Sequence, residues 1–214
     1  MKINIVGKGA FGTFLTELLN PHFELTDTAE TVVLAVPASS YDSCGRYYST
    51  MKNAHLVNVC SIQKPTMDTL LKYTHRVTGI HPLFGRRTPS DKRNSILTYK
   101  FKEHDSHGDE WYSEPCDCEQ EFLTRFSNIS KIFQSSPNDP NIERFTPESH
   151  DILMAKTHAS SVMAAKQLKV FTDRVKDVPD ELIPNSFRLM RDFVKTLDDM
   201  PQGTIESILS NPYI

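Results

Sequence analysis

The clearest pattern with a chemical use is a glycine-rich loop near the start of the chain. It follows an apolar stretch at residues 2–6 and consists of Gly7, Lys8, Gly9, Ala10, Phe11 and Gly12. Between a strand and a helix, the first glycine of such a loop makes a tight turn, the second lets a pyrophosphate approach, and the third packs helix against strand. The N–H groups that begin the helix then face the phosphates. The loop predicts dinucleotide binding; the alternative is a structural turn without a ligand.

An acidic residue is expected about 20 positions after the start of this loop, where it would bind the adenosine ribose. Asp27 has that spacing. If Asp27 ends the second strand, its carboxylate repels a 2′-phosphate, and NAD is favoured over NADP; alternatively, it is only a turn residue. The next apolar stretch, residues 32–37, follows almost at once. We therefore expect the usual second helix and third strand to be missing or vestigial, and the adenosine pocket to be abbreviated.

Composition narrows the class of protein. Only 8 of the 214 residues are glycine, and 24 basic against 27 acidic side chains give a net charge of -3, which argues against a general nucleic-acid binder. No apolar run approaches the roughly 20 residues of a membrane span, and residues 2–6 run straight into the glycine loop, unlike a signal peptide. The four cysteines do not form a small disulfide framework. We expect a reducing, cytoplasmic setting and neither a nucleic-acid nor a membrane partner.

Strand and helix patterns alternate along the first part of the chain. Apolar runs predict strands, and apolar residues spaced three or four apart predict helices. This alternation is typical of an α/β fold, here of the Rossmann type with a mostly parallel sheet. We expect strands at residues 2–6, 23–27, 32–37, 54–62, 76–84, 95–101 and 129–134, and helices at 13–20, 38–52, 65–74 and 120–128.

The pattern changes near residue 145. Acidic residues 102–121 are interpreted as a solvated loop. Helical patterns cover 146–176, 185–198 and 203–209. The predicted organisation is a dinucleotide-binding domain at 1–144 and a small all-helical domain for substrate binding and dimerisation at 145–214. A metal site is an alternative use of the acidic loop, but Cys-x-Cys is not the usual zinc spacing, and we expect no metal. Its ligands would be His104, His107, Cys116 and Cys118.

Several further motifs follow one another along the chain. They are GIHPLFG at 79–85, LAVP at 34–37, NVCSIQK at 58–64, TPESHD at 146–151, the pair Thr157 and His158, and ILSNPY at 208–213. With the glycine loop, this set resembles the prephenate/arogenate dehydrogenase family of tyrosine biosynthesis. The resemblance covers nearly the whole chain, so it is more specific than the glycine loop alone.

The resemblance implies an NAD(P)-dependent oxidoreductase that performs oxidative decarboxylation. The cofactor would take hydride from the ring carbon bearing the 4-hydroxyl of a dicarboxylate or amino-acid-like substrate, and the ring carboxylate would leave as carbon dioxide. An imidazole suits the hydrogen-bonding base, and a guanidinium suits a carboxylate. The helical region would form a homodimer. The implied residues are His81, Ser61 and His158 for catalysis, Arg188 or Arg191 for the substrate carboxylate, and Val36 and Pro37 for the cofactor.

Each of these residues also has a plainer interpretation. His81 would be a capped turn residue, Ser61 a strand-end hydroxyl, and His158 and the two arginines solvated helix positions. The sequence also departs from the family: Asn58 replaces a common Asp, Gln63 is an extra residue, and the helical region is short. Two rivals therefore stay open. One is a non-catalytic dinucleotide-binding relative, and the other is a reductase of another small substrate on the same scaffold.

Overall fold

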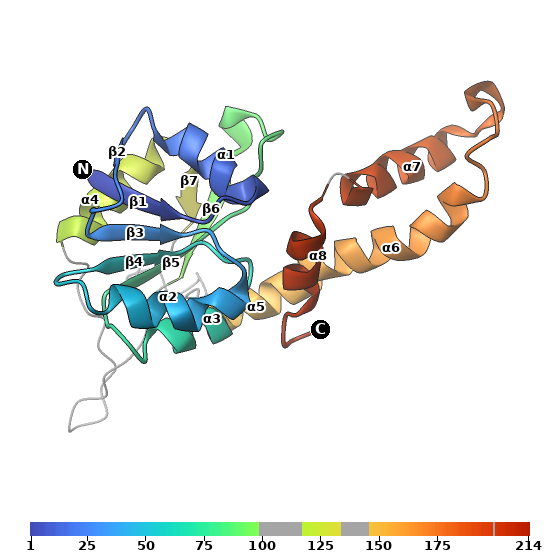
Figure 1. The fold of residues 1–214 in the computed structure, drawn as a ribbon. Coiled ribbons are helices and arrows are strands. Elements are labelled where there is room, and N and C mark those ends of the chain that lie inside the picture. Colours follow the sequence, from blue (N-terminus) through green and yellow to red (C-terminus); the bar gives the residue numbers. More distant parts are fainter. Residues whose placement is uncertain (99–116, 134–145, 199) are drawn as a thin grey trace, which may run out of the picture. The chain divides into compact units, whose positions relative to one another are not determined.

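The computed structural model describes residues 1–98, 117–133, 146–198 and 200–214. Within them the chain forms two compact units, Met1–Asp151 and Ile152–Ile214. The division falls inside a helix, a little beyond the sequence-based boundary at residue 144. The first unit holds the sheet, and the second is helical (Figure 1).

One seven-stranded sheet organises the first unit within the described residues, in the order β2-β1-β3-β4-β5-β6-β7. Neighbouring strands are parallel except β5 and β6, which run antiparallel. This confirms the predicted α/β fold with a mostly parallel sheet. The strands are β1 (Lys2–Val6), β2 (Glu24–Leu25), β3 (Thr31–Leu34), β4 (His55–Asn58), β5 (Val77–Pro82), β6 (Asn94–Thr98) and β7 (Lys131–Phe133).

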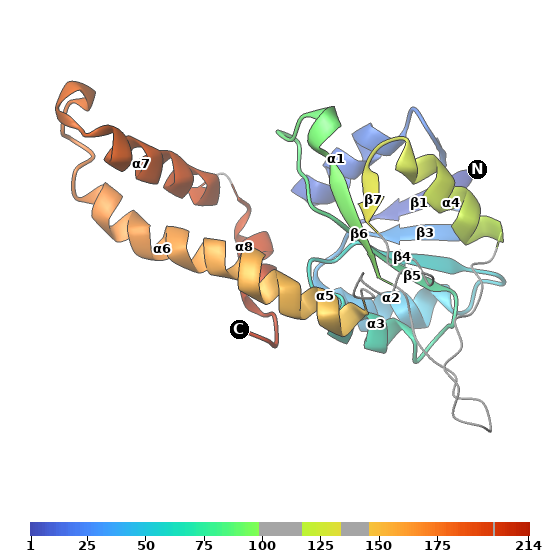
Figure 2. The ribbon, with the colours of Figure 1, turned by 180° about the vertical axis from the view of Figure 1, so that it is seen from behind.

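Helices cover both faces of this sheet (Figures 1 and 2). Alternate residues of a strand point to opposite faces. Val33 of β3 accordingly packs on the side of α1 and α4, and Val32 and Leu34 pack on the side of α2 and α3. Burial on both faces explains why this strand is a continuous apolar run. The helices are α1 (Ala10–Leu19), α2 (Tyr41–Tyr48), α3 (Lys64–Leu70) and α4 (Asp117–Ser127).

The sheet is short on the side of β2, as expected. Strand β2 has two residues, and residues 26–30 lead as a turn directly into β3. Strand β3 then pairs with β1 on the side away from β2. A full Rossmann fold has a further helix and strand at this point. Strand β2 is therefore one edge of the sheet in the described part of the chain, and β7 is the other.

Helix α4 corrects the extent of the predicted acidic loop. It begins at Asp117, so residues 117–121 are helical and not part of a loop. Asp117 and Glu119 lie in its first turn, where acidic side chains interact favourably with the helix dipole. Phe122 and Phe126 are buried against the sheet and supply the packing energy. The rest of the predicted loop lies outside the described residues.

The second unit is built from three helices that follow a π-helical turn. Helix α5 (Pro147–Met154) leads to this turn at Ala155–Ala159, so the single helix predicted over 146–176 is interrupted. Among the described residues, no helix combines the length and the apolar character that crossing a membrane requires. The three helices are α6 (Ser160–Asp173), α7 (Asn185–Asp198) and α8 (Gln202–Leu209), and their core contains Ala159, Val162, Ala165, Leu197, Ile205 and Ile208.

Candidate cofactor and active site

Two positions of the glycine loop have geometry that excludes other residues. Gly7 has a φ of +119°, and a Cβ there would clash with the carbonyl oxygen of Ala35. A Cβ on Gly12 would clash with the carbonyl oxygen of Gly7. The first glycine therefore makes the turn, and the third lets α1 approach the end of β1 closely.

Gly9 differs from these two glycines because neither its backbone conformation nor its packing within the protein requires a glycine. It precedes α1 with extended backbone (φ -70°, ψ 178°). Among the described residues, no heavy atom lies within 4 Å of the position that a Cβ would take. Lys8 and Ala10 are exposed, and Phe11 is half-buried against the core. This open space beside the first N–H groups of a helix fits the pyrophosphate of a nicotinamide dinucleotide.

The other predicted cofactor residues follow neighbouring strands. Asp27 lies just beyond β2, is exposed, and accepts a hydrogen bond on its backbone oxygen from Asn4 Nδ2 at 3.3 Å. Val36 and Pro37 follow β3, which pairs with β1. Because parallel strands end at one edge of a sheet, these residues share that edge with the glycine loop. Open α/β sheets bind ligands at this carboxyl edge.

A chain of three buried side chains ends at the predicted base. His81 lies near the end of β5, and its Nδ1 is 2.9 Å from Nε2 of His150. Nδ1 of His150 is in turn 2.8 Å from Oδ1 of Asp151. All three side chains are at most 3% exposed. The structure thus gives the imidazole of His81 a fixed orientation within the first unit.

Asp151 is anchored at the start of α3. The N–H group of Gln63 donates to Oδ1 of Asp151 at 2.7 Å, and that of Lys64 donates to Oδ2 at 2.8 Å. Because backbone N–H groups only donate, both oxygens of Asp151 act as acceptors here. The same two bonds tie the start of α5 to the turn between β4 and α3.

No role was predicted for His150 or Asp151, although both fall in the TPESHD motif at 146–151. The signal that could have found them is a histidine beside a carboxylate at a predicted helix start. The contact of His150 with His81 spans 69 positions of the chain. A contact of that range follows from the fold and not from local spacing.

The two positions that depart from the family motif form a buried network. Nδ2 of Asn58 donates to Oε1 of Gln63 at 3.1 Å, while its Oδ1 accepts from the N–H of Cys60 at 2.9 Å and the hydroxyl of Tyr41 at 2.7 Å. Nε2 of Gln63 donates to the carbonyl oxygen of Cys60 at 2.6 Å. Asn58 and Gln63 therefore have a structural role, since together they fix the turn that carries Ser61.

Ser61 and His81 lie at the carboxyl ends of neighbouring strands. Ser61 is half-buried in the turn after β4. Asn58 at the end of β4 pairs with Gly79 of β5, and His81 is further along β5. The structure therefore places these two predicted catalytic residues at the sheet edge that also carries the glycine loop.

The remaining predicted residues lie in the helical unit. His158 belongs to the π-helical turn and lines a small hollow of about 70 Å³ with Ser161, Phe193 and others. Nη2 of Arg188 donates to the carbonyl oxygen of Asp180 at 2.7 Å, and Nη1 of Arg191 pairs with its Oδ1 at 2.8 Å. The Arg191 guanidinium holds the pKa of the Asp180 carboxyl below its usual value. Both arginines thus fix the turn before α7.

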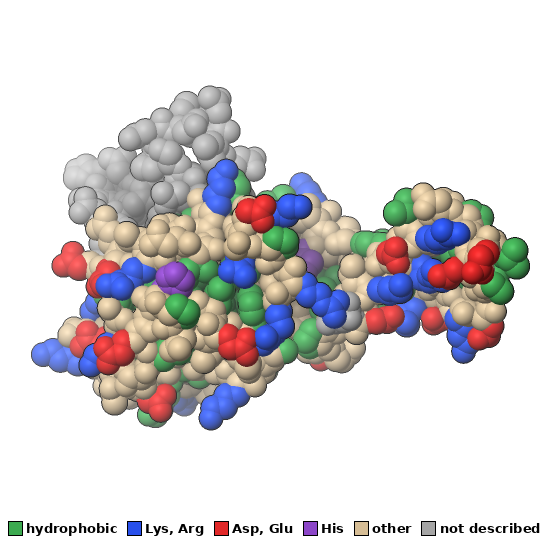
Figure 3. Space-filling view, turned by 90° about the horizontal axis from the view of Figure 1, so that it is seen from above, with side chains coloured by type: hydrophobic (Ala, Val, Ile, Leu, Met, Phe, Trp, Pro, Cys, Tyr) green, Lys and Arg blue, Asp and Glu red, His purple; other side chains and the backbone are tan. Residues whose placement is uncertain are grey.

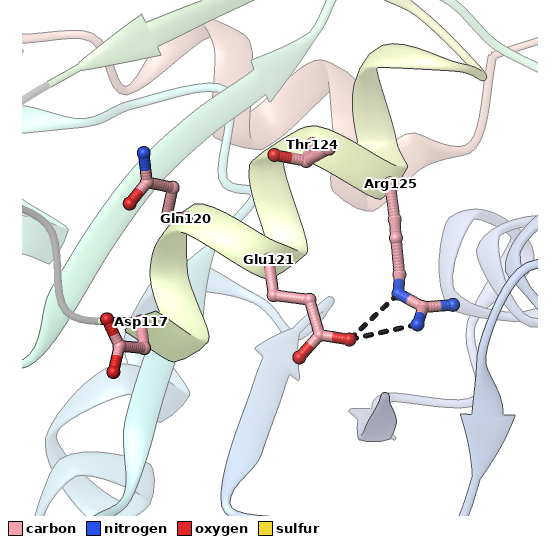
Figure 4. A pocket seen from close by; sticks show the side chains of 5 residues that line it. All are labelled: Asp117, Gln120, Glu121, Thr124 and Arg125. Carbon is pink, nitrogen blue, oxygen red and sulfur yellow. Dashed lines mark hydrogen bonds and ion pairs between the residues drawn. The ribbon is translucent and has the colours of Figure 1, made fainter.

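A wide hollow of about 550 Å³ lies beside α4 (Figure 4). Its side chains come from one helix, and Arg125 pairs with Glu121 at 2.9 Å. Arg125 also donates to the backbone oxygen of His22 at 3.2 Å. Arg125 and Glu121 thus already pair with each other at the surface, and we assign no ligand to this hollow. The lining residues are Asp117, Gln120, Glu121, Thr124 and Arg125.

The alternative metal site falls mostly outside the described residues, which omit His104, His107 and Cys116. Cys118 is described, and its sulfur accepts a hydrogen bond from Arg76 Nη2 at 3.0 Å. In the described ranges, no three His, Cys, Asp or Glu side chains come together as metal ligands.

Three solved structures share the fold over nearly the whole chain. A candidate prephenate dehydrogenase from Corynebacterium glutamicum has a TM-score of 0.68 at 16% identity, over 97% of this chain and 73% of that one. Arogenate dehydrogenase from Synechocystis has a TM-score of 0.57 at 17% identity, over 99% and 86%. Prephenate dehydrogenase from Aquifex aeolicus has a TM-score of 0.56 at 13% identity, over 97% and 86%.

These values show a common fold with prephenate and arogenate dehydrogenases. No protein-family model matches the sequence, and no curated protein sequence matches it either. The resemblance inferred from the ordered motifs is therefore confirmed at the level of the fold.

Proposed function

We propose that this chain is an NAD(P)-dependent dehydrogenase that oxidatively decarboxylates a cyclohexadienol carboxylate, either prephenate or arogenate. One observation carries the proposal: the glycine loop, with its open space beside Gly9, lies at the same sheet edge as the buried and oriented His81. The common fold with prephenate and arogenate dehydrogenases supports the substrate class. The exposed carboxylate of Asp27 beyond β2 favours NAD over NADP.

The nicotinamide, when bound, supplies the hydride acceptor. His81 accepts the proton of the 4-hydroxyl while hydride leaves the same carbon. The bond to the ring carboxylate then breaks, carbon dioxide leaves, and the electron pair of that bond makes the ring aromatic. The proton returns from His81 to the ring oxygen. We assign Ser61 a hydrogen bond to the same hydroxyl or to the nicotinamide.

The helical unit is proposed to hold the rest of the substrate. His158 would line the substrate pocket, and Arg188 or Arg191 would bind a carboxylate through its guanidinium. Arg191 now pairs with Asp180, so a substrate carboxylate would have to replace that partner.

The test separates cofactor binding from turnover. Calorimetry measures the Kd of NAD and of NADP, and the absorbance of the reduced cofactor follows turnover with prephenate and with arogenate. We expect NAD to bind more tightly than NADP and one substrate to be turned over. Cofactor binding without turnover of either substrate would favour the non-catalytic dinucleotide-binding relative over the dehydrogenase. If neither cofactor binds, both hypotheses are wrong.

A matched pair of glycine variants tests the cofactor position. A Cβ on Gly9 or on Gly203 meets no heavy atom within 4 Å among the described residues. Gly9→Val should fold normally and weaken NAD binding, because its side chain would occupy the space assigned to the pyrophosphate. Gly203→Ala, far along the chain in α8, should leave the Kd unchanged. Equal Kd values for Gly9→Val and the wild type would contradict the assignment.

We also propose that the helical unit mediates a homodimer. Large apolar side chains are exposed on it, including Leu182 at 73% and Leu189 at 64%. Figure 3 shows hydrophobic side chains among charged ones on the surface of this unit. Exposed apolar groups of this kind mark interaction surfaces. Light scattering should give a dimer for the wild type and a monomer for Leu189→Asp; a monomeric wild type at micromolar concentration would refute this.

A further inference from the structure

We infer that His150 and Asp151 are positioning residues that make Nε2 of His81 the proton acceptor. The inference rests on the proposed function, in which His81 is the base. It adds two side chains that act through His81 and do not touch the substrate. The observation behind it is the buried chain of hydrogen bonds from Asp151 through His150 to His81.

The direction of this chain follows from which atoms can donate. Both oxygens of Asp151 accept from the N–H groups of Gln63 and Lys64. Oδ1 of Asp151 also accepts from Nδ1 of His150 at 2.8 Å, so when the His150 ring carries a single proton, that proton is on Nδ1. Nε2 of His150 is then an acceptor. Nδ1 of His81 must therefore be the donor across the 2.9 Å contact.

This arrangement leaves the lone pair of neutral His81 on Nε2, which is the form that a general base needs. If His81 carried its proton on Nε2 instead, its Nδ1 would face the lone pair of His150. Turning the His150 tautomer over would relieve that contact only by bringing a lone pair against Asp151. In a buried site, two acceptors that face each other are costly.

The hydrogen bonds that anchor Asp151 and His150 keep His81 in the tautomer with its proton on Nδ1. His150 and Asp151 are 0% exposed. The N–H groups that hold Asp151 belong to the turn fixed by Gln63 and Asn58. The Lys64 ammonium pairs with Asp68 on the same helix. When His81 takes up a proton, the carboxylate of Asp151 stabilises the charge through His150.

The first test reads the tautomer without substrate. Nitrogen-15 NMR of the full chain with labelled histidine distinguishes protonated from unprotonated ring nitrogens, and His81→Asn identifies the His81 signals. We expect Nδ1 of wild-type His81 to be protonated and Nε2 to be unprotonated. In His150→Leu, which removes the acceptor, the signals should shift towards a mixture of the two tautomers. His150→Gln offers an amide oxygen near the position of Nε2 and should restore the wild-type pattern.

The second test reads kcat and KM separately. In His150→Leu, kcat should fall by roughly 100-fold, as expected when a base loses its orienting partner, while KM changes by less than about twofold. In His150→Gln, kcat should be about tenfold higher than in His150→Leu. NAD affinity, measured on each variant, should equal that of the wild type, because the glycine loop is unchanged.

The two tests distinguish the two proposals. A protonated Nε2 on wild-type His81, or wild-type kcat in His150→Leu, overturns the inference. The expected tautomers without turnover of either substrate would uphold the positioning chain and refute the proposed reaction. If His150→Leu fails to fold, the wild-type spectrum and His150→Gln still decide the question.

Discussion

Two clusters, each built on a buried histidine, lie at opposite ends of the same pair of strands. At the carboxyl end, His81 of β5 is linked through His150 to Asp151. At the amino end, Nε2 of His55 on β4 lies 2.8 Å from Oγ1 of Thr78 on β5. That hydroxyl donates to Oε1 of Glu119 on α4 at 2.6 Å. Both clusters thus run from a histidine to a carboxylate through one intermediate group.

The difference lies in the anchoring of the histidines. His150 uses both ring nitrogens, whereas Nδ1 of His55 has no hydrogen-bond partner within the described residues. Burial, reinforced by the Arg76 guanidinium, lowers the pKa of His55 to about 4. A histidine in this state does not take up a proton near neutral pH. The amino-end cluster therefore makes folding sensitive to acid, whereas the carboxyl-end cluster is the one for which we propose catalysis.

The largest expected effect separates the clusters by activity. His81→Asn keeps a donor near the position of Nδ1 for His150 but removes the base. We expect kcat to fall by about 10²- to 10⁴-fold, the range for loss of a general base. The matched variant His55→Gln keeps a donor to Thr78 and should retain wild-type kcat. Initial rates with the active substrate measure kcat for both variants. Equal rates for His81→Asn and the wild type would show that the carboxyl-end cluster is no more catalytic than the amino-end cluster.

The second effect concerns stability in acid. The folded-state pKa of His55 is about 4, against 6.5 for the unfolded chain. The unfolded chain therefore binds the extra proton first, and stability present above pH 6.5 is lost as the pH falls towards 4. The difference in pKa corresponds to about 3 kcal/mol of the free energy of unfolding. Urea titrations at several pH values should show this slope in the wild type.

His55→Gln is the variant that checks this assignment. Glutamine does not titrate. The decrease in the free energy of unfolding between pH 6.5 and pH 4 should therefore be smaller in this variant, by most of the roughly 3 kcal/mol that we attribute to His55. His75 is an exposed histidine near the start of β5, and His75→Gln should leave the slope as it is in the wild type. An unchanged slope in His55→Gln would show that other groups cause the acid sensitivity.

The two clusters also differ in how far the sequence predicted them. GIHPLFG singled out His81 because the motif resembles one of the prephenate/arogenate dehydrogenase family. The glycine loop was equally visible, since the turn at Gly7 and the close approach at Gly12 are local demands. Local geometry leaves a pattern in a single sequence. These elements were therefore predicted together with the strands that carry them.

The partners of both histidines left no such pattern. Glu119 was assigned to a solvated loop, and its contact with Thr78 spans 41 positions of the chain. Asn58 and Gln63 were treated as departures from a family, although the fold uses them as a buried network. The Thr78–Glu119 pairing depends on where α4 packs against the sheet, and the Asn58–Gln63 bond depends on how the turn after β4 folds. That information resides in the tertiary fold and not in the spacing of a motif.

A third and smaller effect comes from the link at the amino end. Thr78→Val keeps the shape of the side chain and removes its hydroxyl, so His55 and Glu119 both lose a partner. Breaking a buried hydrogen bond in this way costs about 1–3 kcal/mol in the free energy of unfolding. Thr124→Val on the exposed face of α4 is the control and should change stability by about 0.5 kcal/mol or less. Turnover should be unaffected by Thr78→Val, and a parallel loss of kcat would mean that the clusters are coupled.

The smallest effect has the opposite sign. Burial raises the pKa of Glu119, although its hydrogen bond from Thr78 lowers it in part. Ionising the folded carboxyl is therefore penalised, so its contribution to stability decreases as the pH rises above the unfolded value. Glu119→Gln retains an oxygen that accepts from Thr78 and removes the charge. We expect it to stabilise the protein at pH 7 by about 0.5 kcal/mol or less, measured by urea unfolding. A clear loss of stability would show that the amino-end carboxylate is needed in its charged form, and the contrast between the two clusters would then rest on His55 alone.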